Sequence, residues 1–173
     1  MELITAQIIG ATALIISSLA PQQNKKNKVL VYKLFSNALY ALQYLILGAF
    51  SAVVTNIIGV IREYIFYRYA KANKDVPISI LYIYILIVLV SGIFTFNGFI
   101  SILPILLSIL TTYSVWQNNL KKYRGITVII IILWMIYNFA VNAFTNAIGN
   151  VISLISAIIA IIRLDIMKNE EKK

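Results

Sequence analysis

Two asparagines, Asn56 and Asn150, lie 94 positions apart inside long apolar runs. An asparagine amide donates and accepts hydrogen bonds, so it can bind a hydroxyl or amide group of a neutral ligand. In lipid its donors would lack partners, which predicts that both side chains face the interior of a helix bundle. The alternative is a clamp between helices, because interhelical hydrogen bonds from polar side chains contribute about 0.6 kcal/mol on average in membranes.

Larger polar and aromatic side chains repeat at the same offset. Tyr40 corresponds to Trp134, and Gln43 corresponds to Tyr137. Each pair within a run is three residues apart and therefore shares one helix face. Aromatic rings there could stack on a sugar or base ring, although Tyr and Trp also pack helices and occupy membrane interfaces. The predicted substrate site consists of Asn56, Asn150, Trp134, Tyr40, Gln43 and Tyr137. Weaker candidates are Asn37, Asn138, Asn142 and Asn146, the last two of which could be plain loop or cap residues.

Catalytic groups are scarce in this chain. It contains no Cys and no His, and its acidic residues number six. Thiol nucleophiles, histidine-based acid–base catalysis and most transition-metal sites are therefore excluded. We expect no enzyme activity, no metal site and no cofactor.

Arg62 and Glu63 are adjacent charges inside an apolar run. Neighbouring residues do not face each other on a helix, so we expect Arg62 to extend toward the lipid headgroups. Glu63 could take up a proton during transport or could be a salt-bridged carboxylate near the cytoplasmic interface. With so few acids inside the runs, facilitated diffusion is the more economical mechanism.

The elements that must position these residues are membrane helices. Hydrophobic residues make up 61% of the 173 positions and charged residues only 12%, against about 25% charged residues in a soluble domain. A membrane helix needs about 20 apolar residues. Runs of this kind predict an all-α integral membrane protein with seven transmembrane helices at approximately 4–20, 29–47, 50–69, 78–96, 99–116, 125–141 and 144–164. Turn-like links are expected at Gly48-Ala49, Asn97-Gly98 and Asn142-Ala143.

The net charge is +9, and the positions of the basic residues agree with seven membrane spans. With seven spans, all fifteen basic residues fall on one side and Glu2 on the other. The positive-inside rule then places the N-terminus outside and the C-terminus in the cytoplasm, in the cytoplasmic membrane. Nucleic acid is not an expected partner, since the charges cluster between apolar runs. The first run lacks a preceding basic residue, so we expect a retained helix rather than a cleaved signal.

An internal repeat organises the seven runs. At the same offset Gln23-Asn24 falls on Gln117-Asn118, and Ala49-Phe50 falls on Ala143-Phe144. A three-helix unit ends on the opposite side of the membrane, so one extra helix is needed before a parallel copy. We therefore expect a single membrane domain, with triple-helix bundles at 4–69 and 99–164, a linker helix at 78–96 and a charged cytoplasmic tail at 165–173.

This layout resembles a known group of transporters. Pro21-Gln22 after the first run, "LWMIYN" at 133–138 and "GNVISL" at 149–154 look like the PQ-loop, SWEET and SemiSWEET families. The nicotinamide riboside transporters of the PnuC type share the layout. In overall length the chain is most similar to bacterial inner-membrane proteins of the YgjV type. The resemblance implies a substrate site lined by Asn56, Asn150 and Trp134, with Tyr40 in the place equivalent to Trp134.

The predicted function is a small-solute transporter for a neutral polar compound such as a sugar, nucleoside or vitamin-like molecule. Pro21 and Gln22 could form a gate, because proline loosens a helix end, or could simply terminate the helix. SWEET-like transporters usually carry prolines in several bundle helices, and the second and sixth runs here have none. A non-transporting membrane protein with the same fold, such as a receptor subunit or assembly factor, is the alternative. Expected partners are the small-molecule substrate and the lipid bilayer, with the chain acting as a monomer or homo-oligomer.

Overall fold

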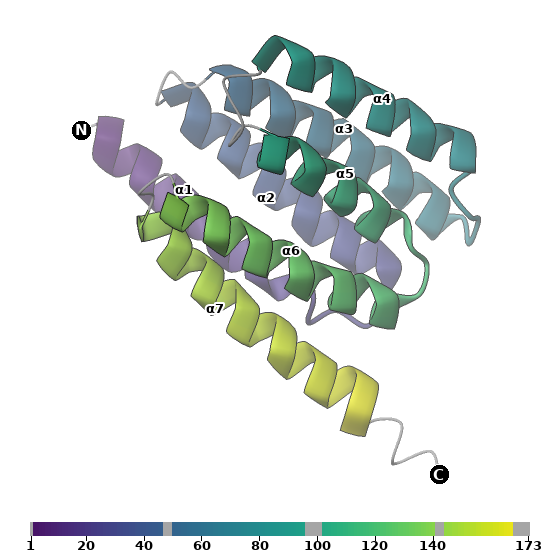
Figure 1. Cartoon of the computed structure of the whole chain (residues 1–173). Helices are drawn as coiled ribbons and strands as arrows, with labels where there is room; N and C mark the ends of the chain where they lie inside the picture. Colours follow the sequence, from purple (N-terminus) through teal and green to yellow (C-terminus); the bar gives the residue numbers. More distant parts are fainter. Residues whose placement is uncertain (1, 47–49, 96–101, 141–143, 168–173) are drawn as a thin grey trace. The chain divides into compact units, whose positions relative to one another are not determined.

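The computed structural model describes residues 2–46, 50–95, 102–140 and 144–167. These residues form seven α-helices and no strand (Figure 1). The predicted number of helices is confirmed for this part of the chain. The helices are α1 (Glu2–Leu19), α2 (Lys26–Ile46), α3 (Phe50–Lys71), α4 (Ile78–Thr95), α5 (Ile102–Trp116), α6 (Leu120–Ala140) and α7 (Phe144–Ile161), followed by a π-helical segment η2 (Ile162–Met167).

Several helix ends differ from those predicted from the apolar runs. α2 and α6 begin three to five residues before the predicted positions, within polar sequence. At α6 the Asn119 side chain explains this, because its Oδ1 accepts hydrogen bonds from the backbone N–H groups of Lys121 and Lys122 at 2.9 and 3.2 Å. At the other end of the chain, the helix continues through Met167, beyond the expected end at 164. The three turns predicted at 48–49, 97–98 and 142–143 lie outside the described residues.

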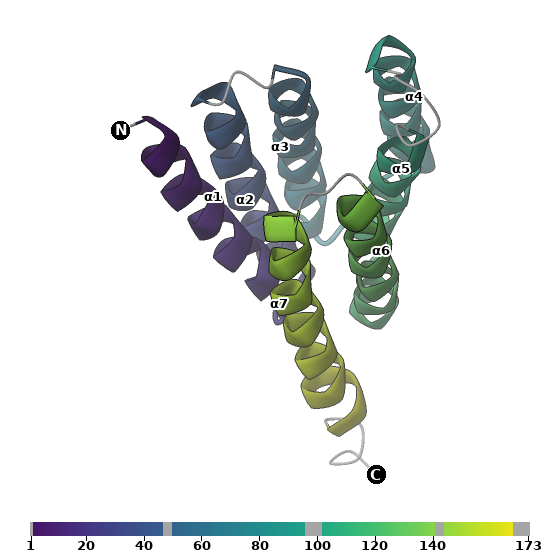
Figure 2. The same cartoon turned by 60° about the vertical axis from the view of Figure 1, so that its left-hand side comes forward.

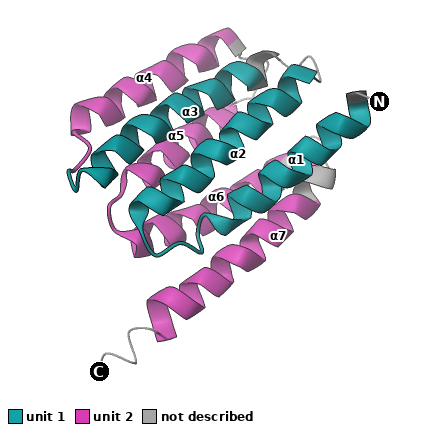
Figure 3. Cartoon of the chain, turned by 180° about the vertical axis from the view of Figure 1, so that it is seen from behind, with its two compact units in different colours: residues 1–74 teal, residues 75–173 magenta. Residues whose placement is uncertain are grey.

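The chain divides into two compact units, residues 1–74 and 75–173 (Figure 3). The first unit contains α1 to α3. In the second, α4 packs against α5, so the helix expected to act as a linker is grouped with the last three helices.

In the first unit α2 lies between α1 and α3 (Figure 2). Two buried glycines permit close packing on either side of it. A Cβ atom at Gly10 of α1 would lie 2.5 Å from Cδ of Gln43, and one at Gly59 of α3 would lie 2.7 Å from Nδ2 of Asn37. An amide from α2 thus covers a bare backbone on each neighbouring helix. Small residues at helix contacts are the usual means of close approach in membranes.

In the second unit, consecutive helices pack against one another from α4 to α7. Gly92 of α4 lies under Ile105 of α5, where an added Cβ would come 2.6 Å from Cδ1. Trp116, at the end of α5, donates from Nε1 to the carbonyl oxygen of Val76 at 2.9 Å, and this bond ties the start of the unit to α5. Asn118 also donates a hydrogen bond to Asp75.

The outer faces of both units carry large apolar side chains. On α4, for example, Ile93 and Phe94 are 74% and 85% exposed. Such surfaces are stable in hydrocarbon but not in water. Two helical stretches in the described part are long and apolar enough to cross a membrane, Lys26–Ile46 and Ile148–Met167, and shorter apolar helices occur at Leu3–Leu19, Ile78–Phe94 and Ile102–Trp116.

Candidate functional site

A buried ion pair lies on α3 of the first unit. Nη2 of Arg62 donates to Oε1 of Glu63 at 2.8 Å, and the two side chains are 9% and 0% exposed. The prediction that Arg62 extends toward the headgroups is therefore wrong. The expectation rested on the rotation of about 100° about the helix axis between neighbouring residues. The Arg62 side chain, however, is long enough to fold back over Glu63. Of the two interpretations of Glu63, the structure favours the salt-bridged carboxylate.

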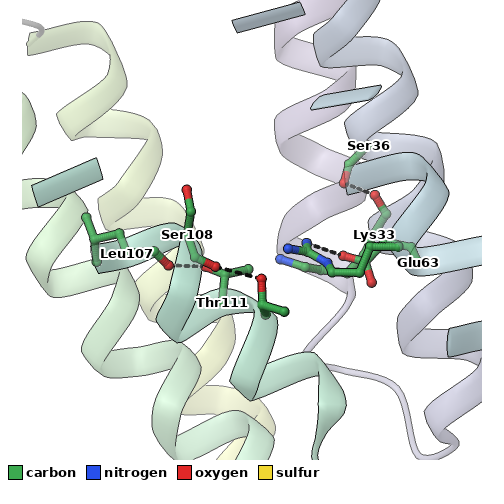
Figure 4. A network of polar contacts seen from close by, with 8 residues as sticks. Lys33, Ser36, Glu63, Leu107, Ser108 and Thr111 are labelled. Carbon is green, nitrogen blue, oxygen red and sulfur yellow. Dashed lines mark hydrogen bonds and ion pairs between the residues drawn. The ribbon is translucent and has the colours of Figure 1, made fainter. Parts of the chain in front are cut away.

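Lysines of α2 complete this cluster. Lys33 lies at the level of Glu63, where the two charges interact, and its carbonyl oxygen accepts a hydrogen bond from Ser36 at 2.9 Å (Figure 4). Lys26 also interacts electrostatically with Glu63. We call Lys26, Lys33, Arg62 and Glu63 the α2–α3 charge cluster. It combines three basic groups with one carboxylate.

A polar seam continues from this cluster between α2 and α3. Lys33 is opposite Glu63, and four residues further along each helix Asn37 is opposite Gly59. The same antiparallel register brings Tyr40 to the level of Asn56, one turn beyond. Both predicted site residues are partly buried. In this unit the register therefore places Tyr40 and Asn56 at one level of the α2–α3 contact, and their role in binding stays a prediction.

Gln43, by contrast, is directed toward α1. Its amide covers the backbone of Gly10, which makes it a helix-packing group in this structure. The ring beside Tyr40 belongs to Tyr44, with centroids 6.4 Å apart in a stacked arrangement. Tyr44 was not among the predicted site residues, although its spacing of four from Tyr40 places both rings on one face.

The other half of the predicted site lies in the second unit. Trp134 and Tyr137 of α6 form an edge-to-face pair with ring centroids 5.5 Å apart. Asn150 of α7 is partly buried, and its Nδ2 atom is buried without a hydrogen-bond partner within the described residues. An amide nitrogen in this state has donors available for a ligand.

Two threonine hydroxyl groups on α5 are occupied within their own helix. Thr111 and Thr112 donate to the carbonyl oxygens of Leu107 and Ser108 at 2.7 and 2.8 Å (Figure 4). Hydroxyls that bond the preceding turn satisfy their own donors and are poor ligand contacts. We therefore assign them no role in binding.

A second buried ion pair, which sequence reasoning missed, joins α6 to η2. Nη1 of Arg124 donates to Oδ1 of Asp165, and the side chains are 3% and 7% exposed. Asp165 was expected to begin a charged tail, yet it lies in the helical extension of α7 and is buried. The available signal was positional: Arg124 precedes the sixth apolar run and Asp165 follows the seventh, so an antiparallel hairpin brings them to the same end.

The proposed gate, Pro21 and Gln22, lies in the turn after α1. The Gln22 N–H donates to the carbonyl oxygen of Leu19, and that of Gln23 to Ala20, both at 3.2 Å. Pro21 is buried and lies two residues beyond the last helical residue. These bonds fit the helix-terminator interpretation, and gating remains a prediction. Within the described ranges, no three His, Cys, Asp or Glu side chains gather where they could hold a metal ion.

Comparison with known proteins covers nearly the full length of the chain. Residues 4–168 match the family model Imp-YgjV, described as bacterial inner membrane protein. No curated protein and no solved structure matches the chain. The extent of the match, together with the apolar helices, shows that the chain belongs to the YgjV family of bacterial inner membrane proteins.

Proposed function

We propose that the protein is a small-solute carrier of the inner membrane that moves a neutral polar compound by alternating access. The resemblance of Pro21-Gln22 and of the repeated helical triplet to the PQ-loop and SWEET transporters supports this proposal. Sugars, nucleosides and vitamin-like molecules are the proposed substrates, because their hydroxyl and amide groups complement asparagine amides and their rings complement aromatic faces. With the intramembrane carboxylates held in ion pairs, facilitated diffusion is the proposed mechanism.

The observation that carries the proposal is the amide nitrogen of Asn150. It is buried without a hydrogen-bond partner among the described residues, and Asn150 is the residue of α7 that corresponds to Asn56 of α3 in the repeat. A buried donor without an acceptor costs about 1–3 kcal/mol. A bound substrate offering a hydroxyl or carbonyl oxygen would recover that free energy.

Replacement of these asparagines tests the assignment. The full chain, purified in detergent, is melted in the presence of glucose, uridine or riboflavin, and any ligand that binds the native state raises the melting temperature. For a compound that does so, we expect Asn150→Ala to weaken binding by about tenfold or more, the equivalent of one lost hydrogen bond to a buried group. Asn24→Ala changes an exposed asparagine in the loop after α1 and is the matched control.

Uptake into proteoliposomes supplies the functional measurement. The double variant Asn56→Ala/Asn150→Ala is expected to lose uptake of the identified compound while keeping the melting temperature of the unliganded protein. Uptake at the wild-type rate by a folded double variant would contradict the site assignment. If no member of the panel is bound or transported, the non-transporting alternative is favoured.

The proposed topology has a separate test. With the N-terminus outside and seven crossings, Lys28 and Lys122 both lie on the cytoplasmic side, and both side chains are exposed. A membrane-impermeant amine reagent should modify them in inside-out vesicles and not in right-side-out vesicles, as measured by mass spectrometry of the peptides. Modification of either lysine from the outside would contradict the topology.

A further inference from the structure

The α2–α3 charge cluster contains more positive charge than its own carboxylate neutralises. Glu63 is engaged by Arg62 at 2.8 Å. Lys33, on the neighbouring helix, makes no ion pair within the part of the chain that the structure describes, and Lys26 adds a second ammonium on the same side. Arg62 and Glu63 cancel, so the charge that remains to be balanced at this level of the two helices is that of Lys33.

The surroundings make this imbalance costly. Lys33 is partly buried, and next to it the chain buries Val29 and Leu30 completely. An ammonium in such a place requires a counter-charge, because an unpaired charge in an apolar environment loses its hydration without compensation. The second carboxylate oxygen of the cluster, Oε2 of Glu63, is buried and has no hydrogen-bond donor among the described residues. The cluster thus offers both unbalanced positive charge and one free acceptor.

A ligand of one chemical class complements both features. Negative oxygens would pair with the Lys33 ammonium in the field of Arg62, and a protonated oxygen of the same group would donate to Glu63. A metal cation does not fit, since it would meet three basic groups and one carboxylate that is already paired. We propose that Lys33, supported by Arg62 and Glu63, binds a small oxyanion group such as phosphate.

The arrangement of α2 provides a route to this position. Lys26 and Lys33 are seven residues apart, so they share one face of α2, about 10 Å apart along the axis. Lys25, just before this helix, and Lys28, in its first turn, are exposed. A basic entrance of this kind raises the local concentration of anions and guides them inward. The source could be a solute in the cytoplasm or the headgroup of an anionic lipid, which present the same chemistry.

This site is independent of the proposed transport function and can be tested by binding alone. The full chain, freed of anionic lipid in a neutral detergent, is titrated with inorganic phosphate at constant ionic strength set by sodium chloride, and the melting temperature is followed. We expect phosphate to stabilise the wild type and Lys33→Gln to bind phosphate about tenfold or more weakly, as expected for loss of a charge-assisted hydrogen bond. Lys28→Gln, an exposed lysine five residues away on the same helix, should bind as the wild type does.

Chemical protection makes the test independent of variant folding. In the wild type, phosphate should slow acetylation of Lys33 by acetic anhydride and leave Lys28 unaffected, as measured by peptide mass spectrometry. A parallel arm compares nanodiscs of phosphatidylglycerol with nanodiscs of phosphatidylcholine. Protection of Lys33 by phosphatidylglycerol alone identifies a lipid headgroup as the ligand, and protection by phosphate identifies a solute. If neither protects Lys33, or if Lys28 is protected equally, the proposal is wrong.

Discussion

Replacing Asp165 with alanine is expected to lower the free energy of unfolding by about 3–5 kcal/mol. The reason is that Arg124 would remain buried without its carboxylate, and both side chains of this pair are at most 7% exposed. The pair also joins the start of α6 to the helical extension of α7, so its loss should release the end of η2. Unfolding by a denaturing detergent, followed by circular dichroism in a neutral micelle, measures the change.

The matched control removes both charges. Arg124→Leu/Asp165→Leu should be far more stable than either single variant, because replacing both members of a buried pair with apolar residues is often neutral or stabilising. An exposed carboxylate gives the second control: Asp75→Ala, at the start of the second unit, loses an exposed hydrogen bond from Asn118 and should lower stability by no more than about 1 kcal/mol. Single variants at 124 and 165 as stable as Asp75→Ala would contradict the buried-pair interpretation.

Glu63→Ala is expected to lower the free energy of unfolding at least as much as Asp165→Ala does, by about 3–5 kcal/mol. Glu63 is fully buried, and its removal leaves Arg62 and Lys33 as like charges at one level of the α2–α3 contact. Glu63→Gln should recover only part of the loss, since the amide can accept a hydrogen bond from Arg62 but cannot balance its charge. The same unfolding measurement applies.

The double variant Arg62→Met/Glu63→Met distinguishes charge balance from packing. Met has similar reach and no charge, so the double variant should retain most of the stability that Glu63→Ala loses. If it is as unstable as Glu63→Ala, the ion pair contributes through shape rather than charge, and the argument for excess positive charge at Lys33 is weakened.

The helices were predictable because long apolar runs in an inner membrane protein favour helices. Seven apolar runs of about 20 residues, separated by short polar links, leave little choice of fold class, since a backbone in hydrocarbon must satisfy its own hydrogen bonds. The first residues of α2 and α6 were harder to predict from the sequence, because helix starts depend on local hydrogen bonds such as those accepted by Asn119. The repeat singled out Tyr40 and Asn56, but the polar seam between α2 and α3 was not predicted.

The charge partners were not predictable from the repeat. At an offset of 94 positions, Arg62-Glu63 corresponds to Ser156-Ala157, and Arg124 and Asp165 correspond to Leu30 and Lys71. Each ion pair therefore occurs in one unit and has no counterpart in the other. A comparison of the two repeats for matching polar residues does not find them. The fold of the arginine chain back onto Glu63 depends on rotamers and on the neighbouring helix, which no spacing rule encodes.

The contacts of Gln43 with Gly10 and of Asn37 with Gly59 have a consequence for how this family can evolve. A larger side chain at either glycine would occupy the volume that the opposing amide fills, so such a change is tolerated only together with a shorter residue on α2. Positions 10 and 43, and positions 37 and 59, should consequently change in concert from one bacterial lineage to another. Both sets of coupled substitutions would be visible on α2, which carries Gln43 and Asn37.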